Sequence, residues 1–369
     1  DDFGNITVIA PQPDIGRDES LPVFDEPDAA PLYSFPDNMR GVYVTPTVDY
    51  AVPNEDGEPL TEEQISAGVS EMLDTAEKNG LNSIIIMTDR KGEVFYSADM
   101  NETVERPLID YAVEAAKERG FYVYLNFSLD CVLDGLKEDD LRSRIDRLAI
   151  TVHGFTVKYP VDGIILDGYY SSKDNTSLED YVKHGSGIGY ENWLPDNGAY
   201  IFSLAADAVR RTNNTVPVGI SLNDVWANYT TSENGSETSV NFEALTDGYA
   251  DTVGYIQNGC ADFIMLKAKG SLSDSSLPFK EIVGWWNKYA EEADIPLYVH
   301  HMNQRICTEA EGWGSPDELV KQVIAASDYD SYKGSAFHSL SSLDKDIMQS
   351  TSALMKHYDN EIDVEGLNL

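Results

Sequence analysis

Short apolar runs alternate with amphipathic stretches along most of this chain. The apolar runs cover 41–48, 83–88, 122–127, 163–167, 217–222, 263–267, 296–300 and 334–338. Stretches with helical periodicity follow them near 61–79, 107–119, 141–159, 197–212, 249–258, 278–293, 316–327 and 344–358. Each run is too short and too apolar to have a solvated face, which predicts buried parallel strands. Eight such units in this order predict a single-domain (β/α)8 TIM barrel.

A doubly wound open sheet is the alternative arrangement of the same elements. That fold carries a Gly-rich phosphate loop after its first strand, and no such loop follows 41–48. Helix starts are indicated at Thr61-Glu62-Glu63-Gln64, Asp196-Asn197 and Ser315-Pro316. The longest breaks, 171–195 and 224–247, follow the fourth and fifth strands, and we expect them on the catalytic face.

The barrel is expected to span 39–360. Residues 1–38 are rich in Pro and Asp without a sustained period, which predicts an extended linker or N-terminal arm. Residues 361–369 are expected to form a C-terminal tail. No run approaches the roughly 20 apolar residues of a membrane helix, so we expect no membrane insertion of this segment.

The charge balance narrows the possible partners. The chain has 26 Lys and Arg against 64 Asp and Glu, for a formal net charge of −38. Nucleic acid and anionic membranes require a positive face, so both are excluded as partners. Such a charge is typical of a solubility device on a secreted protein; salt adaptation or calcium loading is the alternative. Cys131, Cys260 and Cys307 are too few for a disulfide framework or a zinc site, and no cofactor is expected.

The alternation of side chains along barrel strands picks out a candidate site. In 163–167 the apolar Ile164 and Leu166 must face the helices, which turns Asp167 inward at the carboxyl end, where barrel active sites lie. The same rule places further polar side chains at that mouth, namely Asn126, Asn223, Lys267, His300 and His338. The alternative is that these residues only cap the barrel and bond to one another.

A metal site is the less favoured interpretation of the histidines. Adjacent strand residues point to opposite faces, so His300 and His301 are not expected to chelate one ion together. His300, His338 and Asp167 across the mouth are the alternative ligand set, although we expect no metal.

Several segments share their spelling and order with a known family. They are Met39–Val44, Gly80–Ile85, Phe95–Ser97, Ala115–Gly120, Tyr124–Phe127, Tyr159–Tyr170, Val218–Ser221, Trp226–Asn228, Trp285-Trp286 and Gly334–Phe337. In this order they resemble the glycosyl hydrolase-like family 10 barrels, a bacterial group associated with cleavage of peptidoglycan glycan strands. The resemblance runs from about residue 39 to 343. It implies a bacterial glycoside hydrolase that is extracellular or anchored at the cell surface.

Two positions depart from that family's pattern. The family usually has two consecutive acids in the fourth-strand motif, and here the second position is Gly168. Its sixth strand usually ends in a Pro-Gln-aromatic-Trp signature, and here the sequence reads Met265-Leu266-Lys267-Ala268-Lys269. Two cations thus replace an aromatic sugar platform, which leaves the fold inference intact but makes substrate and activity harder to transfer.

Glycosidic hydrolysis normally uses two carboxyl groups. Asp167 is the first candidate. The second is open among acids just beyond strand ends, namely Asp49, Asp89, Asp130 and Asp224. Asp224 ranks first because it follows Asn223 and precedes Trp226.

The positive charge expected at Lys267 has two interpretations, one of which concerns the substrate. It either attracts an acidic group on a sugar or pairs with Asp167 and neutralises it. Tyr169, Tyr170 and Trp226 are candidate stacking faces for sugar rings. The expected function is therefore hydrolysis of a bacterial cell-wall or related acidic glycan, with a polysaccharide or oligosaccharide as partner. A catalytically impaired barrel that binds glycan without cleaving it is the alternative, and barrels also host other lyase or hydrolase chemistries.

Overall fold

The computed structural model describes residues 33–54, 58–91, 93–96, 106–134, 140–168, 178–185 and 187–359. Eight parallel strands close into a barrel in the order β1-β10-β9-β8-β7-β6-β5-β2. They are β1 (Met39–Val44), β2 (Ser83–Met87), β5 (Tyr122–Ser128), β6 (Gly163–Asp167), β7 (Val218–Leu222), β8 (Phe263–Ala268), β9 (Leu297–His301) and β10 (Tyr332–Phe337). The expected (β/α)8 TIM barrel is confirmed. The C-terminal tail, most of the N-terminal arm, Tyr169 and Tyr170 lie outside the described residues.

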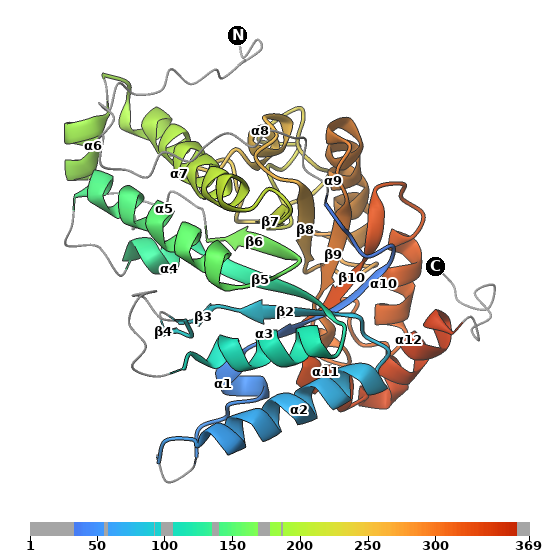
Figure 1. Ribbon diagram of the computed structural model, residues 1–369. Helices are drawn as coiled ribbons and strands as arrows, with labels where there is room; N and C mark the ends of the chain where they lie inside the picture. The colour runs from blue at the N-terminus through green and yellow to red at the C-terminus, as the bar shows by residue number, and fades with distance from the viewer. Residues whose placement is uncertain are drawn as a thin grey trace.

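A ring of helices surrounds the barrel (Figure 1). The ring helices are α2 (Glu62–Lys78), α3 (Leu108–Glu118), α5 (Leu141–Lys158), α7 (Tyr190–Thr212), α8 (Thr252–Gln257), α9 (Phe279–Ala293), α10 (Glu318–Ala326) and α12 (Ser350–Tyr358). Shorter elements are α1 (Pro46–Asp49), α4 (Leu129–Asp134), α6 (Leu178–His184), α11 (Leu340–Asp344), the 3₁₀ turns η1 (Asn303–Arg305) and η2 (Ile347–Gln349), and a hairpin of β3 (Asp89–Arg90) and β4 (Glu93–Val94). The Thr61–Gln64 capping box that begins α2 is confirmed.

The strands separate two apolar layers, as their alternation requires. One layer fills the barrel interior and consists of Met39, Tyr43, Ile85, Tyr124, Ile165, Phe263, Met265, Tyr298 and Ala336. The other lies between strands and helices and includes Ile164 and Leu166. The inward and outward assignments made from the sequence are therefore confirmed for β6. Because the interior is packed, a ligand can reach the barrel only at its ends.

Three element boundaries differ from expectation. The first strand was expected to reach residue 48, but β1 ends at Val44, and Pro46 begins α1 because a proline suits the first turn of a helix. The helix expected at 197–212 begins already at Tyr190, so Asp196-Asn197 is not its start. The ring of Tyr181 contacts those of Tyr190 and Trp193, with centroids 5.3 and 5.7 Å apart, and packs against the added N-terminal part of α7. This part contains Pro195, which by itself disfavours a helix. The helix expected at 344–358 is divided into α11, η2 and α12.

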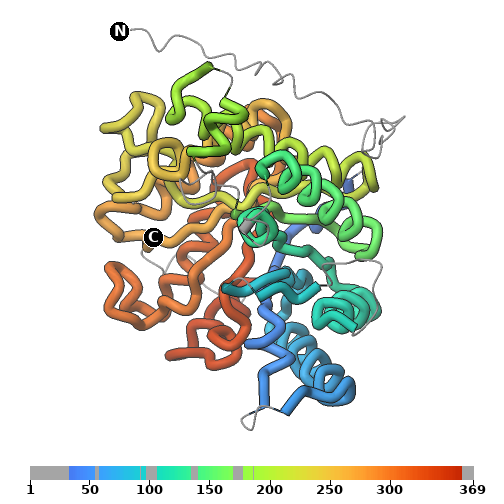
Figure 2. The backbone as a smooth tube through the Cα atoms, turned by 90° about the vertical axis from the view of Figure 1, so that its left-hand side faces the viewer, coloured from blue at the N-terminus to red at the C-terminus, as the bar shows by residue number. Residues whose placement is uncertain are grey.

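The carboxyl ends of the strands form one face of the molecule. The β3–β4 hairpin, α4 and α6 lie at this end, on the left in Figure 1, and the same end faces the viewer in Figure 2. Part of the break at 171–195 is helical, since it contains α6 and the start of α7. The break at 224–247 is held by Glu243, which accepts hydrogen bonds from the backbone and side-chain nitrogens of Asn228 at 2.9 and 2.7 Å. We refer to this end of the barrel as the mouth.

Candidate active site at the barrel mouth

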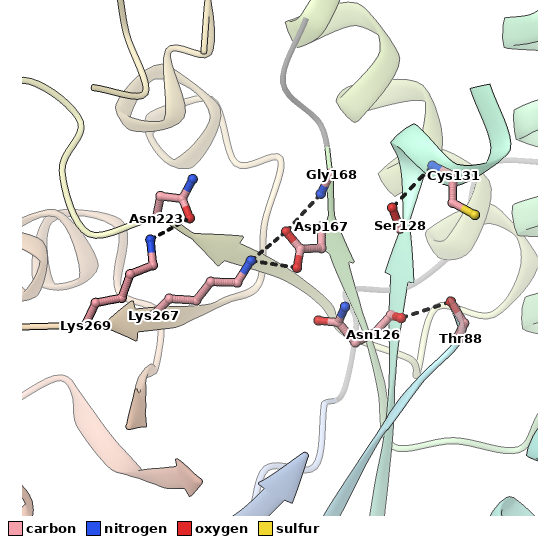
Figure 3. A network of polar contacts seen from close by, with 9 residues as sticks. All are labelled: Thr88, Asn126, Ser128, Cys131, Asp167, Gly168, Asn223, Lys267 and Lys269. Carbon is pink, nitrogen blue, oxygen red and sulfur yellow. Dashed lines mark hydrogen bonds and ion pairs between the residues drawn. The ribbon is translucent and has the colours of Figure 1, made fainter. Parts of the chain in front are cut away.

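An ion pair between Asp167 and Lys267 lies at the centre of the mouth. Asp167 is the last residue of β6, and Lys267 lies near the end of β8. The Lys267 Nζ donates to both carboxylate oxygens of Asp167, at 2.9 Å to Oδ1 and 2.7 Å to Oδ2 (Figure 3). The pair spans β7, which lies between the two strands. Both side chains point into the mouth, as the alternation along the strands predicted. Of the two interpretations of Lys267, the structure contains the one in which it pairs with Asp167.

The surroundings of Asp167 keep its carboxyl ionised. Burial by itself would raise the pKa, but the charge and hydrogen bonds of Lys267 outweigh that effect. The Gly168 amide donates to Oδ1 at 2.9 Å, and the Asn126 side chain also favours the charged form. The net result is a pKa below the ordinary aspartate value. Asp167 can therefore supply negative charge to the site, but it cannot act as a proton donor near neutral pH.

Asn126 links the second and third barrel strands beside this pair. Its side chain is 1% exposed and lies on β5, next to β6. Its backbone carbonyl accepts from both the amide and the hydroxyl of Thr88, at 3.1 and 3.0 Å. These bonds extend the contact between the β2 and β5 chains past the end of β2.

Tyr43, His300 and His338 form an aromatic wall of the mouth. The rings of Tyr43 and His300 stack with centroids 4.0 Å apart, and the centroid of His338 lies 5.7 Å from that of His300. Burial, His338 and Lys267 hold the pKa of His300 well below its usual value; burial and Lys267 also lower that of His338. Both rings are therefore neutral near pH 7. Both ring nitrogens of His300 are buried and lack a hydrogen-bond partner among the described residues.

His301 points away from the mouth, as the alternation predicted. Its Nδ1 lies 2.9 Å from Oε1 of Gln322 on α10, and its Nε2 lies 2.8 Å from the Ser335 hydroxyl. It does not share a ligand position with His300. Across the described ranges, no group of three His, Cys, Asp or Glu side chains is arranged to hold a metal ion.

Asp224, which the sequence ranked as second acid, lies at the end of β7 in a separate pair. Its Oδ2 is 3.5 Å from Lys269 Nζ, and its Oδ1 accepts from the Lys269 amide at 3.2 Å. Burial raises its pKa against the opposing effect of Lys269. Asn223 contacts the same lysine, with its Oδ1 3.4 Å from Nζ. Asp224 has the parity of Leu222, which faces the helix layer.

Trp226 lies in the loop beyond β7. Its indole nitrogen donates to Asp251 Oδ1 at 3.0 Å, and its ring stacks on Trp285 of α9 with centroids 6.0 Å apart. The ring thus packs partly against the helix layer, and its use as a sugar platform stays a prediction.

Asp89 is another of the four acids expected just beyond strand ends. Burial and the charge of Asp167 raise its pKa to about 6. Its Oδ1 is buried with no hydrogen-bond partner among the described residues. Asp89 comes two residues after Met87, which packs against the interior cluster, and follows a bend at Thr88. Which of the four acids is the second catalytic carboxyl stays a prediction.

Gly168 stands where the resembled family has its second acid, and its backbone and surroundings disfavour a side chain there. Its φ is +60°, a conformation that strains other residues. A Cβ at this position would also lie 2.7 Å from the Ser128 hydroxyl and 3.2 Å from Asp130 Cβ. Asp130 reinforces this contact, because its amide donates to the Gly168 carbonyl at 2.9 Å. An aspartate could not replace Gly168 without local rearrangement.

Comparisons with known proteins agree with the fold. No protein-family model matches the chain. Glycosyl hydrolase YngK of Bacillus subtilis (strain 168) is 22% identical over 355 residues, which cover 83% of this chain and 69% of that protein. Glycosyl hydrolase DigH of Escherichia coli (strain K12) is 26% identical over 147 residues, which cover 38% of this chain and 33% of that protein.

Two solved structures share the barrel. The glycoside hydrolase domain of PgaB (BpsB) from Bordetella bronchiseptica has a TM-score of 0.55 at 12% identity, covering 86% of this chain and 98% of its own. The β-glycosidase BGL167 has a TM-score of 0.50 at 12% identity, covering 83% of this chain and 87% of its own. At these identities the likeness establishes a TIM barrel and nothing finer.

Proposed function

We propose that this chain is a glycoside hydrolase in which Asp167 is the principal catalytic carboxylate. The observation that carries the proposal is the ionised Asp167 at the carboxyl end of the fourth barrel strand, held by Lys267 in a mouth with unpartnered polar groups. A buried anion in this position stabilises the positive charge that develops on a sugar ring during glycosidic cleavage. The names of the similar proteins YngK and DigH support the same reaction class, as does the resemblance to glycosyl hydrolase-like family 10.

We propose an acidic glycan of the bacterial cell wall, or a related acidic polysaccharide, as the substrate. In a chain of net charge −38, Lys267 and Lys269 are two cations that project toward the same part of the mouth (Figure 3). A carboxylate on a sugar, such as the lactyl group of muramic acid, would find a charge-assisted partner there. Such a partner would also draw Lys267 away from Asp167 and free that carboxylate for chemistry.

The test of the activity uses peptide-free peptidoglycan strands and measures new reducing ends. Wild-type protein is expected to release them, and Asp167→Asn is expected to abolish the release. Asp344→Asn is the matched control, because Asp344 lies in an exposed pair with Lys78, and it should retain full activity. Absence of cleavage by the wild type, across several acidic glycans and pH values, would refute the proposal.

The substrate class has its own test. The lactyl carboxylates of the strands are converted to neutral methylamides, and kcat/KM is compared with that on native strands. Because the methylamide lacks one charge-assisted hydrogen bond, kcat/KM of the wild type on it should be lower by roughly 10- to 100-fold. Lys267→Met should erase this preference, whereas an equal rate on both substrates by the wild type would exclude recognition of the carboxylate.

A glycan-binding barrel without activity is the second candidate. It is favoured by the contact of Lys267 with both Asp167 oxygens, because a carboxylate so engaged is not free to act. Binding of the strands by calorimetry without any new reducing ends would support this candidate over the hydrolase.

We also propose an extracellular or cell-surface location, which the strongly negative charge supports. Fractionation of the source cells followed by immunodetection would test it, and recovery in the cytoplasmic fraction alone would contradict it.

Within the described residues, no helix has the length and apolarity needed to cross a membrane.

A further inference from the structure

We propose that Asp89 is the proton donor of this site, the acid that protonates the leaving-group oxygen while Asp167 carries the negative charge. The inference rests on the proposed glycoside hydrolase function and adds the second carboxyl group that such a reaction needs.

Asp89 lies at the same end of the barrel as Asp167. Met87, the last residue of β2, is paired with Asn126 on β5, and Ser128 on β5 is paired with Asp167 on β6. Asp89 follows Met87 by two residues, after a bend at Thr88, and begins β3. Asp89 therefore follows a strand, and Asp167 ends a strand, that are separated only by β5. Neighbouring strands lie about 4.8 Å apart, so the backbones of β2 and β6 are on the order of 10 Å from each other.

The segment that leads to Asp89 lines the barrel interior. Ile85 belongs to the interior cluster, and Met87 packs against it. The bonds from Thr88 to the Asn126 carbonyl keep this segment beside β5, and the Phe95 amide donates to the Thr88 carbonyl at 2.9 Å. The β3–β4 hairpin thus holds Asp89 at the rim, near enough for the charge of Asp167 to act on its carboxyl.

The two acids differ in what surrounds them. Asp167 accepts two hydrogen bonds from Lys267 and one from the Gly168 amide, while Asp89 Oδ1 is buried without a partner in the described part of the chain. Burial and the nearby negative charge of Asp167 raise the pKa of Asp89 to about 6, whereas that of Asp167 is lowered. Neighbouring carboxyls whose pKa values are pushed apart in this way are typical of an acid and its charged partner.

Asp224 fits the same role less well. Both of its carboxylate oxygens contact Lys269, and its backbone carbonyl accepts from the Trp286 indole at 2.7 Å. Asp224 is 6% exposed, and both of its oxygens are already engaged, whereas Oδ1 of Asp89 has no partner among the described residues. Asp89 is therefore the better placed second acid.

The proposed step transfers one proton from Asp89 to the leaving group. The bond between the anomeric carbon and the leaving oxygen breaks, and its electron pair stays on that oxygen, which takes the proton of Asp89. A water molecule gives its oxygen to the anomeric carbon, and the proton that it loses restores the acid form of Asp89 by the end of the cycle. Asp167 remains negative in the resting state and stabilises the positive charge on the ring.

Leaving-group dependence tests this role directly. The two probes are peptide-free peptidoglycan strands, whose leaving group must be protonated, and 2,4-dinitrophenyl β-glycosides of N-acetylglucosamine and N-acetylmuramic acid, whose leaving group needs no proton. Asp89→Asn is expected to lower kcat/KM on the strands by about 10²–10⁴-fold and on the dinitrophenyl glycosides by less than about tenfold. Asp167→Asn should lose both activities. Asp344→Asn serves as the surface control and should keep both activities. Asp224→Asn tests the rival acid, and its losses on the strands and on the dinitrophenyl glycosides should not differ.

The outcomes separate the two proposals. If the wild type cleaves neither probe, the hydrolase function fails. If the wild type cleaves both and Asp89→Asn loses both equally or keeps both, the function stands and the role of Asp89 is refuted. A misfolded variant is recognised by its circular dichroism. In that case a carboxyl ¹³C NMR titration of the intact wild type decides: Asp89 must titrate near pH 6 and Asp167 below the ordinary aspartate value, and the reverse order refutes the assignment.

Discussion

Lys267 Nζ contacts both oxygens of the Asp167 carboxylate, at 2.9 and 2.7 Å, from a strand two positions away in the barrel. The two side chains are only 20% and 16% exposed. This geometry gives the mouth an ionised carboxylate and, in the same contact, a cation that a sugar carboxylate could recruit. The predictions on stability and on the proposed activity therefore centre on this pair.

Removing only the cation should destabilise the fold. Lys267→Met leaves the Asp167 carboxylate buried without its main partner, so the free energy of unfolding is expected to fall by roughly 1–3 kcal/mol, somewhat less than for a fully buried pair. The double variant Lys267→Met/Asp167→Asn should recover part of this loss, because no charge is left unpaired. Urea unfolding of the three proteins measures the effect, with Lys78→Met as a control, because Lys78 lies in an exposed pair with Asp344. Additive losses in the double variant would contradict a direct coupling.

Activity should have an acidic optimum. The titratable groups near Asp89 are Asp167 from β6, Tyr96 after β4 and the adjacent Arg90; burial and Asp167 raise the pKa of Asp89 to about 6. The proton donor is lost as pH rises through that value, while Asp167 loses its charge only below the ordinary aspartate range. A profile of kcat/KM on glycan strands should therefore fall above about pH 6 and at strongly acidic pH.

The basic limb of that profile should belong to Asp89. In Asp89→Asn the residual rate on dinitrophenyl glycosides should be flat between pH 5 and 8, whereas a fall near 6 that persists in this variant would assign the limb to another group.

His301 should make stability depend on pH. Burial lowers its pKa from 6.5 to about 4, so its folded form stays neutral while the unfolded chain takes up a proton below about pH 6.5. Stability is therefore lost as pH falls from 6.5 to 4, by about 3 kcal/mol from this group. His301→Gln should show a smaller loss across that window in urea unfolding. The readout is the slope of the free energy of unfolding against pH, not the stability at any one pH. A slope equal to that of the wild type would contradict the prediction.

Gly168 should tolerate no side chain. Gly168→Ala combines the strain of a positive φ with contacts to Ser128 and Asp130, so it is expected to cost about 1 kcal/mol for strain and 1–3 kcal/mol more for crowding. Gly120→Ala is the matched control: its φ is +81°, and a Cβ there would meet nothing within 4 Å. Equal losses in the two variants, measured by urea unfolding, would show that crowding at Gly168 is absent.

The barrel and its inward residues follow from local pattern. Apolar runs with period two and helices with period 3.6 are properties of neighbouring residues, so the eight units were recognisable, and Asp167 was assigned to the mouth by its parity with Ile165. Boundaries were less accurate where packing acts over distance. The contact of Tyr181 with Tyr190 and Trp193 lengthened α7 past Pro195, and no local signal at Asp196 could reveal it.

The pairing of side chains at the mouth required the closed barrel. Lys267 and Asp167 are 100 positions apart, and sequence reasoning left open whether they meet. The proposed choice of Asp89 over Asp224 likewise depends on the charged groups that lie near each carboxyl in the folded chain. The electrostatic environment of a side chain depends on groups that folding brings together from distant strands. Hydrophobic periodicity depends only on residues that are close in the sequence. The chain thus encodes the barrel locally, and its chemistry arises only where strand ends converge.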